Sequence, residues 1–143
     1  MEPTLLDPEI TESTAMYDID FTIETLHKIK NEGIQITLDD FGTGYSSLNY
    51  LIKFPINRLK IDRSFVKDIL QDNNAIIVIK SIINLAKNLN ISVIAEGVEN
   101  SAQFRFLQEE QCDEIQGFLF GKPMKQEEII QLLIGNTWAA IAF

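Results

Sequence analysis

The stretch that decides the fold reads GIQITLDDFGTGYSSLNYL and covers residues 33–51. Its β-branched start at residues 34–38 predicts a buried strand. Two adjacent carboxylates, Asp39 and Asp40, follow, and a glycine-hinged polar loop then opens into a helix. A buried strand that ends in paired acids and a flexible loop is typical of a divalent-metal site.

Strand-like and helix-like segments alternate along the rest of the chain. The hydropathy pattern predicts strands at residues 9–13, 34–38, 58–62, 91–95 and 113–120, and helices at 18–31, 46–52, 75–89, 100–109 and 126–134. Such alternation is the signature of βα units and a parallel sheet. We therefore predict a single α/β domain over residues 1–143, with about five parallel strands and an apolar tail at residues 135–143.

Composition limits the classes of function. The chain has 143 residues, of which 45% are hydrophobic, and a net charge of −9, which argues against a nucleic-acid polymer as partner. The single cysteine, Cys112, cannot form an internal disulfide, which fits a reducing compartment. The sequence contains no apolar run long enough to span a bilayer and no signal-like start. We expect a cytoplasmic protein, or the cytoplasmic part of a larger one.

Polar side chains recur where the predicted strands end, and in parallel α/β folds these ends share one face. The candidates in chain order are Glu9 or Glu12, Asp39 and Asp40, Lys60 or Asp62, Glu96 and Glu99, and Gln116. Together they predict a carboxylate-rich pocket with one lysine. Hard oxygen ligands suit Mg²⁺ or Mn²⁺, and a pair of such ions is suited to phosphodiester hydrolysis.

Each of these features also has a structural explanation. The Asp39–Asp40 pair fits a plain turn as well as a metal site. Lys60 interrupts an apolar strand, and it could serve a structural ion pair as readily as catalysis. Glu96 precedes a helix, where a negative charge is favourable in any case. The joint occurrence of these residues at successive strand ends is what favours a functional pocket.

The motifs resemble those of one known family. The segments EITES (9–13), LDDFGTGYSSL (38–48), LKIDRSFV (59–66), AEGVE (95–99) and QGF (116–118) are similar in kind and order to the motifs of EAL domains. These domains are bacterial cyclic di-GMP phosphodiesterases. The resemblance runs from residue 9 to about residue 133.

The resemblance implies a TIM-like (β/α) barrel that opens cyclic di-GMP to linear pGpG with Mg²⁺ or Mn²⁺. It implies that Glu9 and Asp39 are metal ligands, with Asp39 bridging two ions and Asp40 serving the second. It also implies that Glu96 holds or activates the catalytic water and that Lys60 positions this water.

Further roles follow from the same resemblance. Glu99 would brace the loop after Asp40, and Gln116 would lie beside metal-bound water or substrate. The loop at residues 41–47 would link substrate, metal and a dimer partner. Its candidate contact residues are Thr43, Gly44 and Ser46.

The chain also departs from the family pattern. It contains no Glu-Ala-Leu motif, and no counterpart of the metal-binding asparagine that follows that motif in the family. The chain therefore resembles only the C-terminal part of the domain, and about five strands cannot close a barrel. We expect a homodimer, docking of the missing N-terminal half, or cover by the apolar tail at 138–143, unless the chain is a piece of a larger protein.

Three functions remain open at this point. In the first, the parent domain hydrolyses cyclic di-GMP, and this chain is weak or inactive alone. In the second, the chain is an inactive module that binds cyclic di-GMP or protein. The third possibility is an unrelated α/β metal-dependent enzyme.

Overall fold

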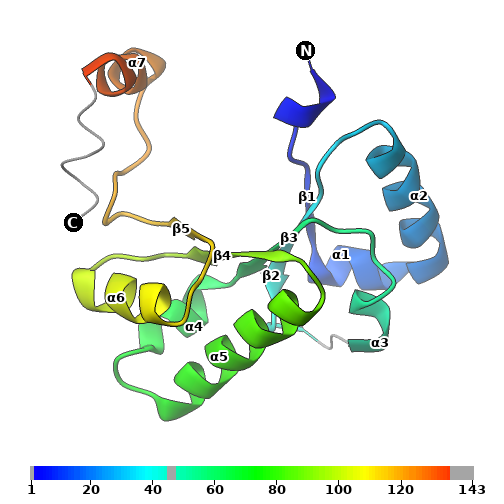
Figure 1. The fold of residues 1–143 in the computed structure, drawn as a ribbon, viewed down its shortest axis with the longest axis horizontal. Coiled ribbons are helices and arrows are strands. Elements are labelled where there is room, and N and C mark those ends of the chain that lie inside the picture. The colour runs from blue at the N-terminus through cyan, green and yellow to red at the C-terminus, as the bar shows by residue number, and fades with distance from the viewer. Residues whose placement is uncertain (1, 45–47, 136–143) are drawn as a thin grey trace.

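Five parallel strands form one sheet in chain order, from β1 to β5 (Figure 1). The structure is a computed structural model that describes residues 2–44 and 48–135. The strands are β1 (Glu9–Thr11), β2 (Thr37–Phe41), β3 (Arg58–Ile61), β4 (Ser92–Glu96) and β5 (Glu114–Gln116). The helices are α1 (Glu12–Tyr17), α2 (Ile19–Asn31), α3 (Leu48–Leu51), α4 (Arg63–Asp68), α5 (Asn73–Asn88), α6 (Ser101–Glu109) and α7 (Gln126–Gly135), with a short 3₁₀ turn, η1, at Pro3–Leu5. The predicted alternation of parallel strands and helices is confirmed.

The longest helix, α5, shows why the sequence folds in this way. Its buried positions are Ala75, Ile79, Ile82, Ile83 and Ala86, which follow the helical period and face the sheet. The Asp72 side chain accepts a hydrogen bond from the amide of Asn74 and caps the helix start. Beyond the helix end, Asn90 has a φ of 56°, which ends the helix as the sequence predicted.

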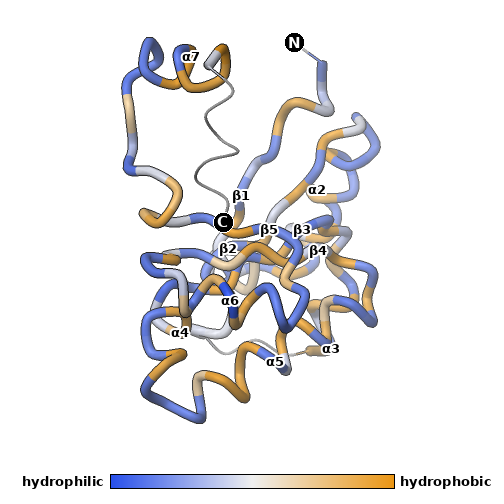
Figure 2. The backbone as a smooth tube through the Cα atoms, turned by 60° about the vertical axis from the view of Figure 1, so that its left-hand side comes forward, coloured by the Kyte–Doolittle hydropathy of each residue, from blue (hydrophilic) through white to orange (hydrophobic). Residues whose placement is uncertain are grey.

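The two faces of the sheet differ in chemistry. Strand side chains alternate between faces, so Leu38, Leu59 and Val93 point toward the helices and are fully buried. The alternate positions carry the polar residues of the predicted site. Figure 2 shows hydrophobic segments along the strands and, alternating with hydrophilic ones, along the helices, α7 included. The apolar face therefore supplies the core and leaves the other face for chemistry.

Several boundaries differ from the sequence-based expectation, and three of them lie near the predicted site. Strand β2 contains Asp39 and Asp40 instead of ending before them, because the pairing with β3 continues to Phe41. Strand β5 ends at Gln116, because Gly117 packs directly against the backbone of Val98. The predicted strand at residues 9–13 gives way to α1 at Glu12.

Helix α7 differs from the other long helices. None of its residues is buried, and it stands away from the sheet in Figure 1. No helix among the described residues is long and apolar enough to cross a membrane.

A buried glutamine ties the loop after β4 to the core. Gln103, in α6, is 4% exposed, and its Oε1 accepts hydrogen bonds from the amides of Glu99 (2.8 Å) and Asn100 (3.2 Å). Its Nε2 donates to the carbonyl oxygen of Val66 at 3.2 Å. The Asn100 side chain completes a capping box at the start of α6. These bonds fix the backbone that follows Glu96.

We predict that Gln103→Ala lowers the free energy of unfolding by about 2 kcal/mol, because it leaves buried backbone groups without partners. Gln103→Glu keeps the acceptor but places a buried carboxylate against the Val66 carbonyl oxygen, so we expect a loss at least as large. Gln108→Ala is the control, since Gln108 is exposed on the same helix. Urea unfolding measures all three, and an equal loss in Q103A and Q108A would contradict the role of Gln103.

Candidate functional site

A β-bulge places both aspartates opposite one lysine. Leu38 pairs with Leu59 and Phe41 pairs with Ile61, so β2 has one more residue than β3 between these pairs. The two residues in question are Asp39 and Asp40, and they face Lys60. Asp40 has a φ of 56°, and its amide donates to Asp39 Oδ1 at 2.9 Å. A bulge re-aims side chains at the end of a strand, which is its effect here.

Lys60 joins three carboxylates from three strands. Its Nζ lies 2.6 Å from Glu96 Oε1 on β4, 2.9 Å from Glu9 Oε1 on β1 and 3.5 Å from Asp39 Oδ2 on β2. The Lys60 side chain is 6% exposed, whereas Asp39 and Glu96 are about one-fifth exposed and Glu9 is about half exposed. The four residues that the sequence placed at strand ends therefore meet around one ammonium group.

The carboxylates keep Lys60 charged. Burial alone would lower the pKa of Lys60, but its hydrogen bonds to Glu96 and Glu9 and the nearby negative charges outweigh that effect and raise the pKa. The pKa of Asp40 is also raised, first because of burial and then because of the charge of Asp39. A further cation near Asp40 would oppose this shift.

A second cation lies one layer below Lys60. The Arg58 guanidinium pairs with Asp7 and, at 3.3 Å, with Glu114 on β5. Thr37 Oγ1 also donates to Asp7, at 2.7 Å. This layer was not predicted from the sequence, although the alternation of Arg58 with Lys60 along β3 indicates it.

Glu12 holds the loop that follows β2. Its Oε2 accepts a hydrogen bond from the amide of Gly42 at 2.9 Å, and the residue is 2% exposed. Its Oε1 is buried without a partner among the described residues, and a Cβ on Gly44 would lie 2.7 Å from it. Glycine at position 44 is therefore what allows the loop to pass so close to this carboxylate.

The remaining candidates occupy the same end of the sheet. Gln116 pairs in register with Glu96 across β4 and β5. Thr43 Oγ1 donates to the Asp40 carbonyl at 2.8 Å, which tightens the turn after the bulge. Glu99 lies in a small pocket with Glu96 and Gln116. Its role as the brace of the loop after Asp40 stays a prediction, and the observed contact to that loop comes from Glu12. Ser46 lies outside the described residues.

The donor set suits a hard cation only in part. Carboxylate oxygens are the ligands that Mg²⁺ and Mn²⁺ prefer. Within residues 2–44 and 48–135, however, the acids do not gather into a group of three or more that could hold a metal. Instead, the ammonium of Lys60 lies at the point on which Glu9, Asp39 and Glu96 converge.

The chain belongs to the EAL domain family, whose model matches residues 3–123. It is 44% identical over 130 residues to the bifunctional diguanylate cyclase/cyclic di-GMP phosphodiesterase MucR of Pseudomonas aeruginosa. It is 45% identical over 134 residues to the signaling protein YkoW of Bacillus subtilis. These matches cover 91% and 94% of the chain but only 19% and 17% of the two relatives.

Solved structures agree with this assignment. The MucR phosphodiesterase in complex with c-di-GMP matches with a TM-score of 0.87 and 44% identity, over 90% of this chain and 52% of that one. A manganese and cyclic di-GMP complex of BlrP1 from Klebsiella pneumoniae matches with a TM-score of 0.80 and 32% identity, over 86% and 31%. The five-stranded sheet is therefore part of a TIM-like barrel.

We predict that Lys60→Met lowers the free energy of unfolding by about 2 kcal/mol or more. This loss of stability is smaller than the loss expected on breaking a fully buried ion pair, because the three carboxylates are partly exposed. Millimolar Mn²⁺ should then raise the melting temperature of the variant more than that of the unsubstituted chain, since a cation can replace the ammonium. Lys80→Met is the control, because Lys80 is 46% exposed and pairs with Glu110 at 2.7 Å. Equal losses in K60M and K80M would contradict this view of Lys60.

We also predict that Glu12→Ala speeds amide exchange at Gly42, because the amide loses its acceptor. Hydrogen-exchange NMR measures this effect. Glu24→Ala is the control, since Glu24 pairs with Lys28 on the exposed side of α2. An unchanged exchange rate at Gly42 in E12A would show that the carboxylate does not hold the loop.

Proposed function

We propose that this chain supplies one part of the active site of a cyclic di-GMP phosphodiesterase and is weak or inactive alone. The observation that carries the proposal is the convergence of Glu9, Asp39 and Glu96 on Lys60 from neighbouring strands. Family membership supports the substrate, because relatives of this chain are cyclic di-GMP phosphodiesterases. The product is linear pGpG.

Each side chain has a role that its position supports. Glu96 accepts a proton from the attacking water, and Lys60, held 2.6 Å from it, orients this water and offsets negative charge on the phosphate. Gln116, beside Glu96 in register, hydrogen-bonds substrate or ordered water. Thr43, Gly44 and Ser46 belong to the loop that contacts substrate, with Glu99 nearby.

Glu9, Asp39 and Asp40 are the residues that would hold Mg²⁺ or Mn²⁺ in this proposal. When bound, the ions supply a nucleophile at neutral pH and stabilise the charge on the leaving oxygen. The raised pKa of Asp40 supports this assignment, because a carboxylate crowded by burial and by Asp39 gains from a bound cation. The manganese and calcium complexes of BlrP1 support the class of metal.

A second candidate function is an inactive module that binds cyclic di-GMP or protein. The absence of a three-acid metal group among the described residues favours it. In either case we propose a cytoplasmic single domain, or the cytoplasmic part of a larger signalling protein, that acts as a homodimer or together with the missing half of the barrel.

Hydrolysis assays test the proposal directly. We expect the chain with Mn²⁺ to form pGpG from cyclic di-GMP far more slowly than the MucR phosphodiesterase, and Asp39→Asn to remove this activity. Asp68→Asn is the control, because Asp68 is an exposed acid on α4. Turnover equal to that of a complete domain would overturn the claim of weak activity. Binding without any pGpG would favour the inactive module, and preference for other phosphoesters would overturn the substrate.

Calorimetry tests the metal site separately. We expect weak Mn²⁺ binding to the chain that Asp39→Asn removes and Asp68→Asn leaves unchanged. Oxygen-ligand sites lose affinity as ligand number and charge fall, which is the reason to expect a weak signal. Heat that is identical for the chain and for D39N would count against a metal at Asp39.

A further inference from the structure

A second polar layer lies beneath the candidate site, and we call it the lower layer. Each of its four members stands two positions before a residue of the site, and they are Asp7, Thr37, Arg58 and Glu114. The site residues that follow them are Glu9, Asp39, Lys60 and Gln116. Side chains two positions apart along an extended chain point to the same face. The lower layer therefore shares the polar face of the sheet with the site.

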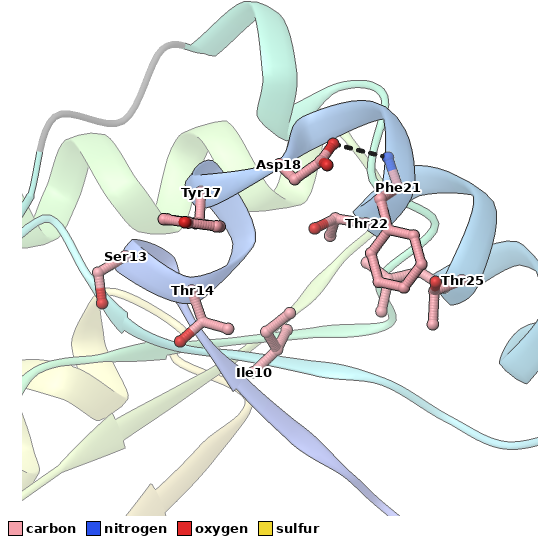
Figure 3. A pocket seen from close by; sticks show the side chains of 9 residues that line it. Ile10, Ser13, Thr14, Tyr17, Asp18, Phe21, Thr22 and Thr25 are labelled. Carbon is pink, nitrogen blue, oxygen red and sulfur yellow. Dashed lines mark hydrogen bonds between the residues drawn. The ribbon is translucent and has the colours of Figure 1, made fainter.

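This polar face is the one turned away from the helices beside β1. Figure 3 shows Ile10 pointing from β1 toward α1 and α2, into a hollow that Phe21 also lines. Glu9, the neighbour of Ile10, points to the opposite face, where it meets Lys60. The Asp7 carboxylate reaches the lower layer on that same face.

Arg58 connects the two outer strands of the sheet from its middle strand. Its guanidinium pairs with Asp7, just before β1, and its Nε lies 3.3 Å from Glu114 Oε1 on β5. Because β3 is the third of five strands in order, these contacts reach across β2 on one side and β4 on the other. A guanidinium presents donors in several directions, so one side chain can hold two carboxylates at once.

Strand β1 has few backbone bonds of its own. It has three residues, and among the described strands it pairs only with β2. Pro8, immediately before it, has no amide to donate, although its carbonyl accepts a hydrogen bond from the amide of Thr37 at 3.1 Å. The Asp7 carboxylate adds side-chain bonds from Thr37, at 2.7 Å, and from Arg58. Asp7 thus anchors the chain two residues before Glu9.

We propose that Arg58 is a positioning residue of the candidate site, which acts through Asp7 to hold the Glu9 carboxylate against Lys60. Glu9 is 48% exposed, more than the other two carboxylates around Lys60, so burial constrains it least. The role in catalysis rests on the proposed function, in which Glu9 would hold a metal ion. The placement of Glu9 by Arg58 does not depend on that function.

A purely structural ion pair would behave differently. Arg58 and Asp7 are each about one-third exposed, and pairs of this kind contribute little to the free energy of unfolding. Losing such a pair would leave the surroundings of Lys60 unchanged. If Arg58 acts through Glu9, its loss changes those surroundings, and the change overlaps with the one caused by altering Glu9 itself.

The ammonium of Lys60 reports the placement of Glu9 without metal or substrate. Its protons should exchange slowly with water, because the side chain is 6% exposed and lies 2.9 Å from Glu9 Oε1. We expect Arg58→Met to speed this exchange about threefold or more in ¹⁵N NMR spectra, and Glu9→Gln to do the same. The double variant R58M/E9Q should exchange no faster than E9Q alone, since both changes remove one contact.

Matched variants separate positioning from general loosening. Lys80→Met breaks an ion pair of 2.7 Å to Glu110, away from the sheet, and should leave the exchange at Lys60 unchanged. Asp7→Ala should match R58M, because Asp7 is the link to β1, and it keeps the test decisive if R58M does not fold. Arg58→Lys should give an intermediate rate, since one nitrogen cannot hold both carboxylates. Unchanged exchange in R58M and D7A, or additive effects of R58M and E9Q, would overturn the proposal.

Calorimetry with Mn²⁺ distinguishes this inference from the proposed function. We expect R58M to weaken Mn²⁺ binding about threefold or more, because a misplaced Glu9 is a lost ligand, and K80M to leave it unchanged. Equal Mn²⁺ affinity in R58M and the unsubstituted chain would overturn the link from Arg58 to the metal site. If the unsubstituted chain binds no Mn²⁺, the proposed metal site fails, and the exchange rates at Lys60 still decide whether Arg58 places Glu9.

Discussion

The ion cluster around Lys60 is the interaction on which the polar face of this structure depends. A lysine buried in an apolar strand is costly unless its charge is compensated. Here Glu9, Asp39 and Glu96 compensate it from three different strands, at 2.6–3.5 Å. The same contact holds three carboxylates together that would otherwise repel one another. The ammonium thus supplies the positive charge on which these three carboxylates converge.

The bulge in β2 and the carboxylate of Glu12 set the geometry around that cluster. The bulge turns Asp39 toward Lys60 and places Asp40 beside it, at the cost of a left-handed backbone. Glu12 then fixes the start of the following loop through the Gly42 amide. The polar residues of the site therefore lie on one face of the sheet, and the hydrophobic core lies on the other face.

Local patterns in the sequence were sufficient for much of this account. Helical periodicity located α5 within two residues at each end. The recurrence of polar residues at strand ends pointed to Asp39 and Glu96, whereas the choice of Glu9 over Glu12 and of Lys60 over Asp62 came from the family resemblance. The bulge could not be predicted, because it depends on how β2 registers with β3 and not on β2 alone. Glu12 was predicted only as an alternative to Glu9, and its contact with the Gly42 amide was not predicted, since it depends on the turn of α1. Arg58 was missed because its partners, Asp7 and Glu114, lie far from it in sequence.

The most direct test of the account is a pH titration of the Lys60 side-chain nitrogen by NMR, without added metal. The three carboxylates should raise the pKa of Lys60 above the ordinary value of about 10.4. The ammonium and the stability that it contributes should then persist until the pH rises above that ordinary value. A Lys60 midpoint below that ordinary value would show that burial outweighs the carboxylates, and would contradict the central role of this cluster.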